Sequence, residues 1–171
     1  MEKKIKIVLD ADVIIHFVKG GLLHLLPGIF PEYDYVVLDY VREELNKATR
    51  HQLDMQMSVL KNIRGIEFAP TGDAQSVYVR LKRQFGKGES ACMAYCKTHN
   101  DVLGSSNLKD IADYCDENGI VYLTTIDFLY YAIRRSVITV DRANDFVRMV
   151  REKGSKLPIV DFNTFVSAKT V

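Results

Sequence analysis

Short runs of apolar, often β-branched residues alternate along this sequence with stretches of helical spacing. In residues 51–63, for example, Leu53, Met57, Leu60 and Ile63 recur at intervals of three and four. The expected strands are residues 4–9, 35–38, 66–68, 102–103 and 120–123, with an edge strand at 159–161. The expected helices are residues 12–19, 22–26, 41–49, 51–63, 74–85, 89–98, 108–117, 128–134 and 141–153. This alternation predicts right-handed βαβ units, and therefore an α/β fold whose mainly parallel central sheet is covered on both faces.

The size and composition of the chain narrow the class of protein. With 171 residues and no linker, repeat or shift in composition, we expect a single domain over residues 1–171. Hydrophobic residues make up 47% and charged residues 26%, which excludes a disordered, collagen-like or low-complexity chain. Lysine and arginine total 23 against 22 acidic residues, so any binding of nucleic acid must depend on local basic patches.

Two further features of the sequence indicate the cellular location of the protein. No apolar run reaches the roughly 18 residues that suggest a membrane-spanning helix, so we expect no membrane association. The cysteines form no C-x-x-C pair and are expected as reduced thiols in the core. Together these features predict a cytoplasmic protein.

Acidic residues stand where the predicted strands end. Ligands of open parallel sheets bind beyond the carboxyl ends of the strands, so these positions are the first candidates for a functional site. Asp10 ends the first run, and Asp12 follows two residues later. Glu89 begins a predicted helix after Gly86-Lys87-Gly88, where the helix dipole alone would also favour an acid.

Glu44 is selected by its place on a helix. In the helix predicted at residues 41–49, Val41, Leu45 and Ala48 mark the buried face. Glu44 lies at the edge of that face, whereas Glu43 lies on the solvent side. We therefore expect Glu44 to be an acid that faces inward.

Two further aspartates follow later strands, and each has a structural alternative. Asn107 is placed to cap a helix with Asp110 in its first turn, and Thr125 with Asp127 is placed similarly. Taken singly, each aspartate is better explained as part of a cap. Their expected position at the same edge of the sheet as Asp10 makes them candidates for a shared site.

Several carboxylates gathered in one cleft require a cation or protons. Two carboxylates about 5 Å apart repel each other by roughly 3 kcal/mol at an effective dielectric constant near 20. Ligand sets made only of oxygen suit Mg²⁺ or Mn²⁺. A cation held in this way activates water and stabilises the charge that develops on a phosphodiester, so the pattern favours hydrolysis of a nucleic-acid backbone.

Four segments with a characteristic order and spacing carry a family resemblance. They read IVLDADVIIHF, VREEL, GKGESACMA and LGSSN, and they extend over most of the chain up to about Ala132. In these segments the chain resembles a PIN domain. The resemblance implies a three-layer α/β/α fold and a Mg²⁺- or Mn²⁺-dependent endoribonuclease acting on single-stranded or structured RNA. It also implies a homodimer and, because many prokaryotic members are toxins of toxin–antitoxin pairs, a protein inhibitor as partner.

The resemblance also assigns site residues. The first acid of the family falls on Asp10, the helix acid on Glu44 and the third acid on Glu89. The fourth acid of the family follows the next strand, where this chain has Ser105-Ser106-Asn107. Asn107 can offer a carbonyl oxygen to a cation but no negative charge, and Asp110 or Asp127 can supply the missing charge.

Two other functions compete with the nuclease. The first is a binding module for RNA or protein with a PIN-like fold, in which Asn107 marks a degenerate site. The second is a haloacid-dehalogenase-type phosphatase, because Asp10-Ala11-Asp12 resembles its nucleophile motif, with Thr125 contacting phosphate. Its later lysine and acids are matched poorly, by Lys153 or Lys156 and by Asp161. Basic residues that could contact an RNA backbone are Lys82, Arg83, Lys87, Arg134 and Arg135.

Overall fold

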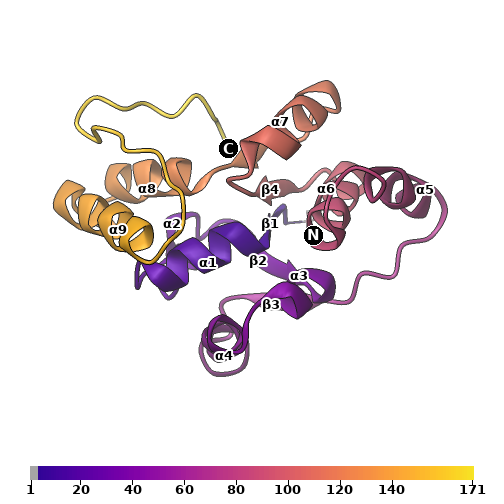
Figure 1. Ribbon diagram of the computed structural model, residues 1–171, viewed down its shortest axis with the longest axis horizontal. Helices are drawn as coiled ribbons and strands as arrows, with labels where there is room; N and C mark the ends of the chain where they lie inside the picture. Colours follow the sequence, from indigo (N-terminus) through magenta and orange to yellow (C-terminus); the bar gives the residue numbers. More distant parts are fainter. Residues whose placement is uncertain (1–3) are drawn as a thin grey trace.

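The chain folds around a five-stranded sheet in which all the strands are parallel (Figure 1). The computed structural model describes residues 4–171, so residues 1–3 of the predicted domain lie outside the described part. The strands are β1 (Lys6–Leu9), β2 (Asp34–Leu38), β3 (Arg64–Ile66), β4 (Val102–Gly104) and β5 (Tyr122–Leu123), in the spatial order β3-β2-β1-β4-β5. The predicted α/β class with a parallel sheet flanked by helices is confirmed.

Helices connect consecutive strands and flank the sheet. They are α1 (Ala11–Lys19), α2 (Leu26–Ile29), α3 (Asp39–Glu44), α4 (Lys47–Met55), η1 (Gln56–Leu60), α5 (Gly72–Leu81), α6 (Lys87–His99), α7 (Leu108–Glu117), α8 (Thr125–Arg134) and α9 (Val140–Glu152). The α6 helix packs against β1, β2 and β4, whereas α1 packs against α3, α4, α8 and α9. Figure 1 shows α5 and α6 together at one side and α8 and α9 at the other. None of the helices within residues 4–171 has the length and apolar composition needed to cross a membrane.

The centre of the sheet is β1, and its position determines where a ligand can reach the fold. Ile7, Val8 and Leu9 are fully buried, because β1 has neighbouring strands on both sides and helices above and below it. The chain leaves β1 toward β2 and β3, and then crosses back to β4 on the other side of β1. The carboxyl ends of β1 and β4 therefore form a topological switch point, where ligands of such sheets bind.

Three sequence predictions of secondary structure are wrong, and the strand predicted at residues 66–68 lies two residues earlier, as β3. Residues 159–161 form no strand, and Ile159 is 76% exposed, because the chain after α9 is irregular. The helix predicted at residues 22–26 instead covers Leu26–Ile29, since Pro27 is accommodated in its first turn.

The third error concerns residues 41–49, which form two helices rather than one. Helix α3 ends before Leu45, whose backbone is extended. Asn46 then caps α4: its side chain accepts a hydrogen bond from the backbone N–H of Thr49 at 2.9 Å. Ala48 is consequently exposed and Thr49 is buried, so the face predicted from a continuous helix does not exist.

Candidate functional site

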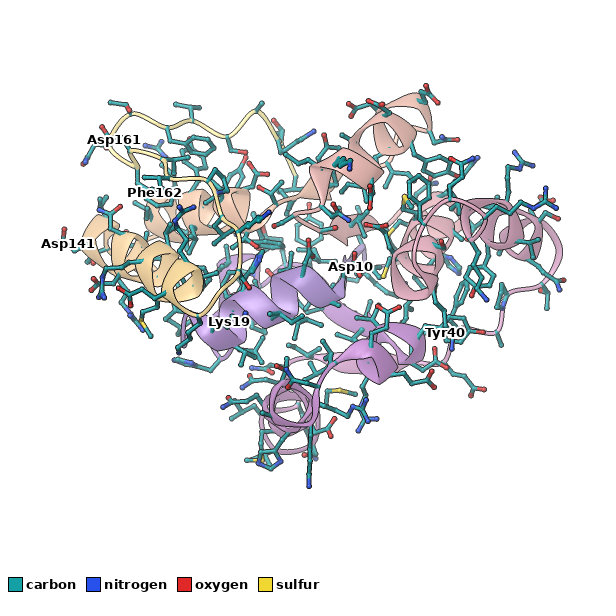
Figure 2. The ribbon with its side chains drawn as sticks, in the orientation of Figure 1. Asp10, Lys19, Tyr40, Asp141, Asp161 and Phe162 are labelled. Atoms are coloured by element: carbon teal, nitrogen blue, oxygen red, sulfur yellow. The ribbon has the colours of Figure 1, made fainter. Side chains whose placement is uncertain are left out.

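Asp10 lies at the switch point, directly after β1. It is the N-cap of α1, and its Oδ1 atom accepts a hydrogen bond from the backbone N–H of Ala11 at 2.8 Å. Its Oδ2 atom accepts one from the Ser105 hydroxyl, 3.2 Å away, which follows the neighbouring strand β4. Asp10 is 5% exposed and lies near the middle of the molecule at the start of α1 (Figure 2). The site therefore begins between the ends of the two central strands.

The turn of residues 105–107 also holds the next acid. Oδ2 of Asp12 accepts a hydrogen bond from the backbone N–H of Ser106 at 2.8 Å, and its Oδ1 atom accepts one from the N–H of Val13 at 2.7 Å. Asp12 is half-buried in the first turn of α1. The turn after β4 thus fixes both aspartates of the Asp10-Ala11-Asp12 segment.

Asn107 connects two further acids to this turn. Its side-chain Nδ2 donates to Oε1 of Glu89 at 2.9 Å and to Oδ2 of Asp110 at 2.8 Å. Glu89 is buried in the first turn of α6, and Asp110 is half-buried in the first turn of α7. Asn107 occupies the N-cap position of α7 as expected, but its side chain makes no capping hydrogen bond. Its amide is directed to the carboxylates instead.

Glu44 reaches the same place from α3 by a route that differs from the prediction. The residue is expected to face inward, and although it is exposed, its carboxylate is directed to α6. Its Oε1 atom nevertheless accepts a hydrogen bond from the backbone N–H of Gly88 at 2.7 Å, in the first turn of α6 and next to Glu89. A Cβ atom at Gly88 would lie 2.6 Å from Oε2 of Glu44, so the glycine makes room for the carboxylate.

These five acids, Asp10, Asp12, Glu44, Glu89 and Asp110, are called the acidic cluster below. Within residues 4–171, none of them forms an ion pair with a lysine, arginine or histidine. Neighbouring Glu43, by contrast, pairs with Lys87 at 3.1 Å. The fold therefore leaves the charges of the acidic cluster without a basic partner.

Burial and mutual repulsion change the proton affinities of the cluster. The pKa of Asp10 is raised well above its ordinary value, chiefly by burial and then by the charge of Asp12, with smaller contributions from Glu89 and Glu44. Burial, together with the charge of Asp110, raises the pKa of Glu89 to about 7. Burial also raises the pKa of Asp12 to about 6, against the opposing effect of its hydrogen bonds from Ser106 and Val13. Acids from separate parts of the chain thus share one electrostatic environment.

The chemistry of the cluster suits a hard divalent cation. All its side-chain donors are carboxylate oxygens, which Mg²⁺ and Mn²⁺ prefer, and the space at Gly88 admits the Glu44 carboxylate. In residues 4–171, however, no three His, Cys, Asp or Glu side chains already stand in the arrangement of a metal centre. Asp10, Glu44 and Glu89 meet at one edge of the sheet without forming a complete coordination sphere.

Asp127 has other partners. It closes a capping box with Thr124, whose N–H and hydroxyl donate to Oδ2 at 2.9 and 2.8 Å, and its Oδ1 atom accepts from the Ser167 hydroxyl at 2.6 Å. The sequence suggested Thr125 as the N-cap of α8, but the N-cap is Thr124. Both oxygens of Asp127 are occupied by bonds that do not involve the acidic cluster.

A buried polar network behind the turn was not predicted. The Ser106 hydroxyl accepts from the backbone N–H of Thr125 at 2.7 Å and donates to its Oγ1 atom at 2.8 Å. That Oγ1 atom also lies 2.9 Å from Nδ1 of His16, whose pKa is lowered to about 4 by burial and by Lys19. The network anchors the turn of residues 105–107 to α8 and α1. Its members are far apart in the sequence, so only the position of Thr125 just after a strand could have suggested it.

The basic residues proposed to contact RNA divide into two groups. Arg135 forms a double hydrogen bond with Glu32, and Lys87 pairs with Glu43 and lies over the ring of Tyr40 at 4.1 Å. The remaining residues are exposed and form no ion pair within the described part of the chain: they are Lys82, Arg83 and Arg134.

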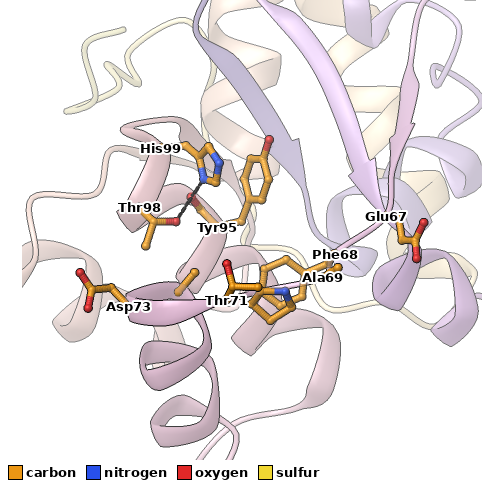
Figure 3. A pocket seen from close by; sticks show the side chains of 10 residues that line it. Glu67, Phe68, Ala69, Thr71, Asp73, Tyr95, Thr98 and His99 are labelled. Carbon is orange, nitrogen blue, oxygen red and sulfur yellow. Dashed lines mark hydrogen bonds between the residues drawn. The ribbon is translucent and has the colours of Figure 1, made fainter.

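A hollow of about 570 Å³ lies elsewhere, between the β3–α5 loop and the end of α6 (Figure 3). His99 stacks on Tyr95 there, with ring centroids 4.1 Å apart, and its Nδ1 atom lies 2.9 Å from the Tyr95 carbonyl oxygen. No member of the acidic cluster lines this hollow. The concentration of buried, mutually repelling acids is therefore the stronger candidate for a functional site.

Comparisons of the whole chain with models of protein families, with curated proteins and with solved structures found no match.

Proposed function

We propose that this protein is a PIN-like endoribonuclease that uses Mg²⁺ or Mn²⁺ to hydrolyse phosphodiester bonds of RNA. The observation that carries the proposal is the acidic cluster itself. Carboxylates from four separate segments, all buried or half-buried except the exposed Glu44, converge at the switch point of a parallel sheet, and none has a basic partner within residues 4–171. Several unpaired negative charges at one edge are costly to the fold unless a ligand of opposite charge neutralises them.

The residues proposed to hold the ion are Asp10, Glu44 and Glu89, as the family resemblance suggests. Asp110 is favoured over Asp127 as a further acid, since Asp127 is engaged by Thr124 and Ser167. The bound ion would supply Lewis-acid stabilisation of the negative charge that develops on the phosphate, and activation of a water molecule.

The protein contributes the orientation of the metal ligands and the cations that hold the RNA. The backbone N–H of Ala11 and the hydroxyl of Ser105 donate hydrogen bonds to the two oxygens of the Asp10 carboxylate. These bonds fix the orientation of the carboxylate at the end of β1. Glu89 is buried in the first turn of α6, where its carboxylate is placed to help hold the ion. Lys82, Arg83 and Arg134 are exposed cations that could hold the RNA backbone. The dimer and the protein inhibitor implied by the resemblance, and the cytoplasmic location expected from the cysteines and the apolar runs, belong to this same proposal.

The phosphatase alternative is supported less well. Thr125, proposed there to contact phosphate, has its hydroxyl buried between Ser106 and His16. Lys153 donates to the backbone oxygen of Lys19 at 2.8 Å, and Asp161 is exposed and bonded to Asn163. These residues have structural partners of their own, none of which belongs to the acidic cluster.

A binding module remains the second candidate, because one observation favours it. The Asn107 amide donates to Glu89 and Asp110 and thereby satisfies part of the cluster without any ion. Such a protein would keep the fold and bind RNA or a partner protein without cleaving it.

The test is cleavage of a labelled single-stranded RNA by the purified protein with millimolar Mn²⁺, compared with Asp10→Asn. We expect cleavage that EDTA abolishes and that Asp10→Asn reduces at least about 100-fold, since several kcal/mol of transition-state stabilisation are lost. Asp161→Asn serves as the control and should cleave normally.

Three other results would change the assignment. RNA that is bound but left intact by the inhibitor-free protein would replace the nuclease with the binding module. Hydrolysis of an aryl phosphate that depends on Asp10 would favour the phosphatase. Cleavage that persists in Asp10→Asn would contradict the proposed site.

A further inference from the structure

The Asn107 side chain stands between two acids of the cluster. The same nitrogen, Nδ2, donates to Oε1 of Glu89 at 2.9 Å and to Oδ2 of Asp110 at 2.8 Å. These acids belong to different helices, α6 and α7, and in the part of the chain that the structure describes they are linked by hydrogen bonds only through this amide. The NH₂ group is thus the only positively polarised group shown in contact with both carboxylates within residues 4–171.

The direction of the amide follows from the chemistry of its partners. Ionised carboxylates only accept hydrogen bonds, and only the NH₂ side of an asparagine can donate to two of them at once. The carbonyl oxygen of Asn107 is therefore turned away from Glu89 and Asp110. In this orientation Asn107 does not offer the oxygen ligand that a cation between these acids would require.

We propose that Asn107 is a latch that takes the place of a cation between Glu89 and Asp110, and that it must release both carboxylates before a divalent ion binds them. This inference rests on the proposed metal site and adds how that site is regulated. Asn107 is a positioning residue here, because it acts through the two acids and not on the substrate.

The surroundings of the latch allow it to open without moving the turn. Ser105 and Ser106 are held by Asp10, Asp12 and Thr125, so the backbone on one side of Asn107 is fixed. Asn107 itself is exposed, and its side chain makes no capping bond to α7. A rotation of this one side chain into solvent is therefore sufficient to free Glu89 and Asp110.

The latch and a simple ligand role predict opposite effects of Asn107→Ala on metal affinity. If the amide competes with the ion, its removal should tighten Mn²⁺ binding roughly tenfold, since two hydrogen bonds to carboxylates no longer have to be broken. If instead the Asn107 oxygen ligates the ion, the same change should weaken binding. Asn107→Ser, which keeps a small polar residue in the turn, should shift the affinity in the same direction as alanine.

The experiment is a calorimetric Mn²⁺ titration of wild type, Asn107→Ala, Asn107→Ser and Asn107→Asp. Thermal melts in EDTA confirm that each variant is folded. Asn118→Ala is the matched control, because Asn118 caps the other end of α7 and bonds Tyr114. We expect tighter binding in all three Asn107 variants and an unchanged affinity in the control. Asn107→Asp should also melt at a lower temperature than wild type in EDTA and recover with Mn²⁺.

The outcomes separate the latch from the proposed function. Unchanged or weaker binding by Asn107→Ala and Asn107→Ser, with clear binding by wild type, overturns the latch and leaves the metal site standing. Absence of Mn²⁺ binding in every protein, Asn107→Asp included, overturns the proposed metal-dependent function and the latch with it.

Discussion

Two buried aspartates at opposite ends of the central strands differ in the charge of the groups around them. Asp101 precedes β4 and is 4% exposed, and Asp10 follows β1 and is 5% exposed. Asp101 accepts hydrogen bonds from the backbone N–H and the ammonium of Lys6, at 2.9 and 3.2 Å. Asp10 has no basic partner within residues 4–171 and instead lies in the field of Asp12, Glu89 and Glu44.

The difference separates a structural acid from a candidate functional one. A buried carboxylate that contacts its own ammonium group is neutralised locally and ties two strands together. A buried carboxylate surrounded by other carboxylates reduces stability, and such groups are concentrated where a ligand or a proton completes the charge balance. Asp127 resembles Asp101 in this respect, since its bonds to Thr124 and Ser167 give it a complete structural role.

The first prediction contrasts the two aspartates directly. Asp101→Asn leaves the Lys6 ammonium largely buried without its partner, so we expect a loss of about 3–5 kcal/mol in the free energy of unfolding. Asp10→Asn removes a repelling charge and keeps an acceptor for Ala11, so in EDTA it should be at least as stable as wild type. Urea unfolding at pH 7 measures both. Equal losses in the two variants would show that Asp10 is a structural acid like Asp101.

The second prediction uses pH. The pKa of Glu89 is raised from its ordinary 4.5 to about 7, so between these values the folded protein binds a proton that the unfolded chain does not. Stability without metal should therefore fall as the pH rises through this window, by roughly 3 kcal/mol for this group.

A second group opposes this trend and must be separated from it. The pKa of His16 is lowered to about 4, so its contribution to stability is lost as the pH falls from 6.5 toward 4. Unfolding in EDTA of wild type and Glu89→Gln, measured from pH 4.5 to 7.5, isolates Glu89 because His16 and Asp12, whose pKa is raised to about 6, are common to both. The variant should gain stability relative to wild type as the pH rises; a constant difference would contradict the assigned environment.

The third prediction concerns the space at Gly88. Gly88→Ala would place a Cβ atom 2.6 Å from Oε2 of Glu44 and so displace this carboxylate from the start of α6. We expect Mn²⁺ affinity to fall roughly tenfold or more, by analogy with the loss of groups that orient metal ligands. Gly86→Ala is the control, because a Cβ atom there meets nothing within 4 Å. Equal affinity in both variants would remove Glu44 from the site.

Part of the site follows from the borders of the predicted strands and helices. Asp10 stands at the end of a predicted strand and Glu89 at the start of a predicted helix, and the structure places both at the same edge of the sheet. The predicted helix face that points to Glu44 does not exist, since α3 ends at Glu44 and Ala48 is exposed. The Glu44 carboxylate reaches the site by accepting a hydrogen bond from the backbone N–H of Gly88. The two residues are 44 positions apart, so the local spacing of apolar residues cannot predict this contact.

The local sequence also fails to distinguish Asp110 from Asp127. Both follow a strand and both stand in the first turn of a helix, so their local sequences are nearly equivalent. They are distinguished by partners from elsewhere: Glu89 acts on Asp110 through Asn107, and Ser167 of the C-terminal segment engages Asp127.

Short-range patterns were sufficient for the α/β class and the parallel sheet, because burial on both faces forces continuous apolar strands and helical spacing between them. They also located the acids at strand ends, since chain order places those positions along one edge. Which acids are neutralised, and by what, depended on side chains brought together from distant segments. The free energy of a charge is determined by its surroundings in space, and those exist only once the chain has folded.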